Sequence, residues 1–185
     1  TPSEKFEPGL NGYPENFSVD VGEKVVIYYS GDITFKNDFI TGLDIKSLTT
    51  DELTSIDFSN HKNIPIHPCK SFAEKGCEFK GKIEIDTIDL KPDFYQIALK
   101  TSAGQDSNPI FFIIKNNSLN VEPNEVAFIL PYFTWQAYNT SGGGNLHSGP
   151  LNKNNKFRTM REVSFNRPFR YSTSDYYPGL SEEPI

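Results

Sequence analysis

The sequence predicts a mainly β protein in two parts, and three observations support this. Aromatic residues make up 14% of the 185 residues, and these side chains favour strands over helices, as do Val and Ile. Thirteen glycines and thirteen prolines supply turns. Short apolar or alternating segments recur every 8–12 residues or so, a spacing typical of a sandwich. We therefore predict an Ig-like β-sandwich over residues 1–116 and a second, incomplete part over residues 117–185.

The expected strands of the first part are separated by turns containing Gly, Asp or Pro. The clear candidates are residues 17–21, 24–30, 82–86, 94–100 and 110–114, with weaker ones at 33–35 and 43–45. Residues 49–80 are polar, contain Pro65 and Pro68, and are expected to be mostly loop. No helix is predicted before residue 115.

The two cysteines, Cys69 and Cys77, both lie in this long loop, and Gly76 eases a return of the chain between them. A disulfide here would close a short loop and stabilise the fold by roughly 2–3 kcal/mol. Two free thiols are the alternative, and a metal site lacks ligands because only His67 is near. We favour the disulfide, which predicts an oxidising compartment and hence a secreted, extracellular or periplasmic protein.

Three Asn-X-Ser/Thr sequons fit the same compartment. They make Asn16, Asn116 and Asn139 candidate N-glycosylation sites. The chain opens with Thr1-Pro2-Ser3, as a processed N-terminus would, although a trimmed chain would look the same.

Charge and hydropathy argue against two classes of partner. The net charge is −6 and the pI is about 5.1, whereas a nucleic-acid-binding protein needs a basic face. No apolar run approaches the ~20 residues of a membrane span. We therefore expect no nucleic-acid partner and no membrane span.

The boundary of the second part lies within a polar linker at residues 115–120. Residues 126–130 are apolar without alternation and end at Pro131, the pattern of a strand buried on both faces of a parallel sheet. The rest is mostly polar and irregular. We expect the first strand and loops of an α/β domain that another chain completes.

A weak candidate ligand pocket follows this strand at Trp135, Tyr138 and Asn139. The carboxyl ends of parallel strands are where α/β sheets bind ligands. Trp and Tyr could line a pocket, and Asn could donate and accept hydrogen bonds. We favour the alternative, in which the aromatic side chains pack the second part onto the sandwich and Asn139 caps a turn.

Other polar features have structural interpretations. Gly142-Gly-Gly144 lacks the Lys-Ser/Thr of a phosphate loop and predicts a turn. The histidines, His61, His67 and His147, do not have the spacing of a zinc site. The basic run predicts a solvated or ion-pairing face, with binding of an acidic ligand as the alternative; its members are Arg158, Arg161, Arg167 and Arg170.

Two motifs in the second part resemble the large subunit of N,N-dimethylformamidase and its relatives. The more specific is Trp135-Gln-Ala-Tyr-Asn139 followed by Gly142-Gly-Gly-Asn-Leu146. Downstream, Ser164-Phe-Asn-Arg-Pro168 is similar to the family's Ser-Phe-Asp-Arg-Pro. In the first part, Gly12-Tyr13 and Ser18-Val-Asp-Val-Gly-Glu23 are similar to family patterns, so the resemblance spans nearly the whole chain.

The resemblance implies an amidohydrolase that cleaves small formamides at an iron ion held by two tyrosines and a glutamate. Those ligands are expected after the Ser-Phe-Asp-Arg-Pro motif, so we assign no metal ligand and no catalytic residue in this chain. No cofactor is expected here, and any iron would belong to the partner chain. His147 and Asn166 depart from the family, which has an aromatic residue and an Asp at these positions.

Two functions are consistent with these observations. The first is a secreted N-terminal fragment or subunit of a dimethylformamidase-like protein, which pairs with a second polypeptide that completes the α/β domain and carries any metal site. The second is a non-catalytic protein on the same fold, which binds or carries a pigment or another ligand, or is purely structural.

Overall fold

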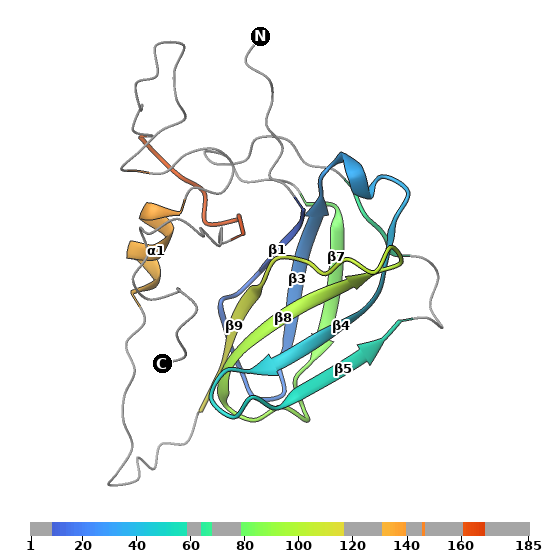
Figure 1. Cartoon of the computed structure of the whole chain (residues 1–185). Helices are drawn as coiled ribbons and strands as arrows, with labels where there is room; N and C mark the ends of the chain where they lie inside the picture. Colours follow the sequence, from blue (N-terminus) through green and yellow to red (C-terminus); the bar gives the residue numbers. More distant parts are fainter. Residues whose placement is uncertain are drawn as a thin grey trace, which may run out of the picture.

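The computed structural model in Figure 1 describes residues 9–58, 64–67, 79–116, 131–139, 146 and 161–168. The strands are β1 (Leu10–Pro14), β2 (Ser18–Asp20), β3 (Lys24–Gly31), β4 (Phe39–Ser47), β5 (Leu53–Asp57), β6 (Ile64–Pro65), β7 (Gly81–Asp86), β8 (Asp93–Thr101) and β9 (Ile110–Lys115). A 3-10 helix, η1 (Ile33–Phe35), and one α-helix, α1 (Tyr132–Tyr138), complete these ranges. The predicted mainly β fold is confirmed. Within these ranges no helix is long and apolar enough to cross a membrane.

The strands form two sheets, which lie one over the other in Figure 1. One sheet has three antiparallel strands in the order β1-β3-β7. The other has the order β2-β9-β8-β4-β5, with β6 also paired to β4. Its pairings are antiparallel, except that β2 runs parallel to β9.

The core lies between the sheets because the strands alternate buried and outward residues. In β7, Ile83 and Ile85 point inward, whereas Lys82 and Glu84 lie outside and form an ion pair at 2.9 Å. Both sheets contribute to one apolar cluster. Its fully buried members include Leu10, Ile27, Tyr29, Leu43, Ile97, Leu99, Ile110 and Phe112.

The predicted strands at 17–21, 24–30, 82–86, 94–100 and 110–114 are confirmed with small shifts of their ends. The weak strand at 33–35 is wrong. These residues form η1, because the Asp32 carboxylate accepts a hydrogen bond from Thr34 N at 2.8 Å and caps its first turn. The weak strand at 43–45 is the centre of the longer strand β4.

Three strands were not predicted. β5 and β6 lie in the stretch expected to be mostly loop, so that expectation is wrong for their residues. β1 contains Asn, Gly and Pro, which disfavour strands. It forms because Gly12 lacks a side chain: a Cβ there would lie 2.5 Å from Ile110 Cδ1 and 2.9 Å from Tyr28 O.

Tyr29 makes the stability of the sandwich sensitive to high pH. Its ring is buried, its hydroxyl donates to Pro65 O at 3.2 Å, and burial raises its pKa from 10.0 to about 12. A raised folded pKa gives stability that is fully present below pH 10 and is lost as the pH rises toward 12. We expect urea unfolding to show this loss in the wild type and a smaller loss in Tyr29→Phe. An identical decline in Tyr29→Phe and in Tyr138→Phe, the exposed control, would contradict this expectation.

Candidate functional site

Helix α1 contacts the sandwich through a row of aromatic rings. Phe111 on β9 meets Phe94 on β8 with their centroids 5.8 Å apart, and Phe94 meets Phe17 at 6.3 Å. Phe17 in turn packs against Tyr132, the first residue of α1, at 4.6 Å. The Phe17–Phe94 pair is edge-to-face and the other two are tilted, and aromatic pairs away from a face-to-face arrangement are stabilising beyond the area they bury. The row therefore holds α1 beside strands β8 and β9.

This helix depends on packing for its stability. It is only seven residues long, and Pro131 at its N-cap makes no side-chain capping bond. Its Phe, Trp and Tyr residues are mediocre helix formers, and a helix this short is marginal in water. For that reason the sequence did not predict it.

The C-terminal end of α1 is capped by residues far along the chain. The Gln136 carbonyl accepts a hydrogen bond from Arg167 Nη2 at 2.6 Å. The Ala137 carbonyl accepts one from Leu146 N at 3.0 Å. The last carbonyls of a helix have no partner within it, and they carry its partial negative charge. A guanidinium is therefore well suited to this position.

Polar side chains form a buried network around this cap. Asn139 Nδ2 donates to Pro168 O at 2.8 Å and to Gln136 Oε1 at 3.3 Å. Gln136 Nε2 donates to the Tyr132 hydroxyl at 3.2 Å. We call these five residues, Tyr132, Gln136, Asn139, Arg167 and Pro168, the motif junction, because they connect the Trp135 motif to the Ser164-Phe-Asn-Arg-Pro168 motif.

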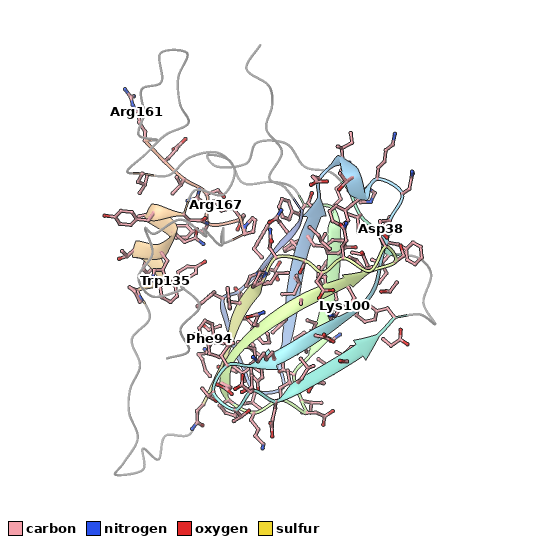
Figure 2. All side chains as sticks on the ribbon, viewed as in Figure 1. Asp38, Phe94, Lys100, Trp135, Arg161 and Arg167 are labelled. Carbon is pink, nitrogen blue, oxygen red and sulfur yellow. The ribbon has the colours of Figure 1, made fainter. Side chains whose placement is uncertain are left out.

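Three polar side chains of the motif junction are almost completely buried. Gln136 is 1% exposed, Asn139 3% and Arg167 0%. Burial raises the pKa of Tyr132, and the hydrogen bond from Gln136 offsets part of that rise. Figure 2 shows Arg167 and Trp135 in this region, on the same side of the molecule as Phe94. The arrangement fixes two chain segments to each other.

The three residues of the predicted pocket differ in how far their side chains are buried. Asn139 turns its amide inward to the Pro168 carbonyl, Tyr138 is exposed, and Trp135 is partly buried. The contact to the sandwich that the structure gives is made by Tyr132. A ligand pocket at Trp135, Tyr138 and Asn139 stays a prediction, and so does its packing alternative.

The sequons differ in the accessibility of their asparagines. Asn16 and Asn116 are exposed. In Asn139, the nitrogen that would carry the glycan is buried and donates two hydrogen bonds. Glycosylation stays a prediction at all three sites, and the geometry favours Asn16 and Asn116.

The predicted basic run does not form one solvated face. Arg161 is exposed, but Arg167 is completely buried, so the expectation is wrong for Arg167. Arg167 and Gln136 were both missed as site residues. The available signal was their membership of the two motifs, and Arg167 is also followed by Pro168, which restricts its backbone.

Several predicted features lie outside the described residues. They are Cys69, Cys77, Gly142–Gly144, His61, His147, Arg158, Arg170 and the apolar run 126–130. In the parts of the chain that the structure describes, no group of three or more His, Cys, Asp or Glu side chains could hold a metal ion. The absence of a metal site from the whole chain stays a prediction.

The fold and the motif junction define a β-sheet protein with a helical segment pinned to one side. Residues 45–183 match the family model described as N,N-dimethylformamidase beta subunit-like, C-terminal. Because the match covers three quarters of the chain, the chain belongs to this family. The matched stretch begins within β4 and includes the whole motif junction. No curated protein and no solved structure matches the chain.

Proposed function

We propose that this chain is a secreted subunit of a dimethylformamidase-like protein and that a second polypeptide pairs with it. The family is described as subunit-like, which suggests a partner chain. The observation that carries the proposal is an exposed apolar surface beside the motif junction. We call it the α1 face: its centre is the contacting pair Phe133 and Phe165, and the exposed side chains of Tyr138 and Leu146, at the C-terminal end of α1, are counted with it.

The α1 face has the composition of a protein interface. Phe133 is 76% exposed and Phe165 48% exposed, although their rings lie in an edge-to-face pair at 5.8 Å. Phe165 also stacks on Tyr132 at 6.1 Å, which connects the face to the aromatic row on the sandwich. Aromatic residues are enriched at interface cores and are frequent hot spots. Clustered exposed aromatic side chains therefore support a partner at this position.

In the parts of the chain that the structure describes, the hydroxyl of Tyr132 accepts a hydrogen bond from Gln136 Nε2 at 3.2 Å, and we assign it no metal-binding role. In the proposal, any metal site and any amide hydrolysis belong to the partner chain, because the resemblance places the family's iron ligands after the Ser164–Pro168 motif.

The proposal includes an Ig-like topology for the sandwich. The strand orders β1-β3-β7 and β2-β9-β8-β4-β5 correspond to the Ig strands A-B-E and A′-G-F-C-C′. Tyr95, near the start of β8, donates its hydroxyl to Lys91 O at 2.8 Å, as in the tyrosine corner of Ig domains. Ile97 then occupies the position where antibody domains have their second cysteine.

The tyrosine corner predicts a measurable loss in Tyr95→Phe. The Lys91 carbonyl loses its partner, so the free energy of unfolding should fall by about 1 kcal/mol. Urea unfolding at neutral pH measures the change against Tyr138→Phe, which removes the hydroxyl of a side chain that is 41% exposed. Equal stability of the two variants would argue against the corner.

Secretion and the Cys69–Cys77 disulfide remain part of the proposal. The chain on either side of the cysteines is attached to one face of the three-stranded sheet. Ser30 Oγ donates to His67 O at 2.6 Å, and Phe79 packs on Tyr13, which is paired with Tyr28. Ser30 and Tyr28 are about 7 Å apart along β3. The loop thus leaves and returns at neighbouring points, which supports a short bridge, and a thiol count of the intact chain tests it.

A carrier or binding protein on the same fold is the second candidate. The exposed rings of Phe133 and Tyr138 could stack on an aromatic ligand as readily as on a protein. Iron analysis and a formamide hydrolysis assay on the intact protein from its source separate the two. Iron with hydrolysis supports the enzyme subunit, whereas a partner chain with neither supports the carrier.

A further inference from the structure

We infer that Arg167 is a latch: α1 is ordered only when the segment 161–168 is docked, and docking also assembles the α1 face. The helix and this segment would then form one folding unit, distinct from the sandwich. This inference rests on contacts within the chain and does not require the proposed partner.

The first support is the dependence of the helix end on other segments. Of the carbonyls in its last turn, Trp135 O is bonded locally to Asn139 N at 2.9 Å. The next two, at Gln136 and Ala137, are bonded by Arg167 and Leu146. When segment 161–168 leaves, this two-turn helix loses the Arg167 bond to its Gln136 carbonyl and, of these two bonds, keeps only the one from Leu146.

The second support is the burial of the Arg167 charge. Removing a guanidinium from water costs several kcal/mol, and hydrogen bonds within the protein must offset that cost. Arg167 is 0% exposed and is bonded to the negative end of α1. Burial of the Arg167 charge and capping of α1 are therefore favourable together, so we expect the helix and the segment to dock as one unit.

The third support is the geometry of the turn at Arg167. Arg167 N donates to Phe165 O at 2.9 Å, which closes a three-residue turn. The turn allows Arg167 to point into the motif junction while Phe165 lies outside against Phe133. Asn139 ties the next residue, Pro168, to the helix. One docking event therefore caps α1 and places Phe165 on the α1 face.

The sole tryptophan of the chain makes the latch testable, because Trp135 lies on α1 and reports this helix alone. In Arg167→Met we expect red-shifted emission and acrylamide quenching at least about twice that of the wild type. Arg161→Met is the matched control, since Arg161 is exposed on the same segment. The β signal in far-UV circular dichroism and its urea midpoint should stay unchanged in both variants.

Two results would overturn the inference. Wild-type quenching of Trp135 in Arg167→Met would show that α1 stays ordered without the latch. Loss of the β signal together with the tryptophan change would show that the helix and the sandwich are one unit. Asn139→Ala provides an independent variant, because it removes the tie to Pro168 without burying or removing a charge. We expect Asn139→Ala to raise the acrylamide quenching of Trp135 less than Arg167→Met does. If neither variant raises it, the inference is wrong.

Discussion

Phe112→Ala is expected to lower the free energy of unfolding by about 3–5 kcal/mol, a large part of the roughly 5–15 kcal/mol that stabilises a typical domain. Phe112 on β9 is 0% exposed and stacks on Tyr95 of β8 at 5.3 Å. Its removal leaves a cavity between the sheets that neighbouring rigid strands cannot fill. Urea unfolding followed by circular dichroism measures the change.

Ile33→Ala is the control for this core substitution. Ile33 lies on η1 and is 62% exposed, so its truncation should change stability by less than about 0.5 kcal/mol. A Phe112→Ala loss as small as that of Ile33→Ala would mean that the two sheets do not pack around this ring.

Phe133→Ser combined with Phe165→Ser is expected to weaken pairing with the second polypeptide by at least about 2 kcal/mol, roughly 30-fold in affinity. The two rings are the most exposed aromatic side chains of the α1 face and contact each other. Sedimentation velocity or calorimetry with the partner chain separated from the intact protein gives the affinities.

Ile88→Ser is the matched control for pairing. Ile88 is 65% exposed but follows β7, away from α1 in the chain, so its loss should not affect the affinity. If the double variant and Ile88→Ser bind the partner equally well, the α1 face is not the interface. In that case the separate substitutions Phe133→Ser and Phe165→Ser need not be measured.

The strands that could be predicted from sequence are those whose pattern directly reflects burial. In β7, every second residue from Gly81 is buried and the rest are charged, so alternation alone predicts the strand. Strand β5 offers no such pattern, because it is a mostly exposed edge strand. It forms through its register with β4, in which Ser55 Oγ donates to Asp44 at 2.7 Å.

The residues of the candidate site also divide into those that a sequence pattern indicated and those that only the folded chain brings together. Trp135 and Asn139 were selected because they follow an apolar run that predicts a buried strand, and they also stand in a recognisable motif. The role of Arg167 could not be predicted, since an arginine in an acidic chain is expected to be solvated. Only the folded chain brings it to the carbonyl of Gln136 and makes its burial favourable. Contacts between distant segments, rather than local propensity, define this site.

Native mass spectrometry of the protein isolated from its source, followed by denaturing mass spectrometry, measures whether this chain is paired. We expect a complex that separates into a polypeptide containing this sequence and a second polypeptide. A polypeptide containing this sequence that is alone under native conditions would contradict the pairing, and the exposed α1 face would then be assigned to a ligand rather than to a partner.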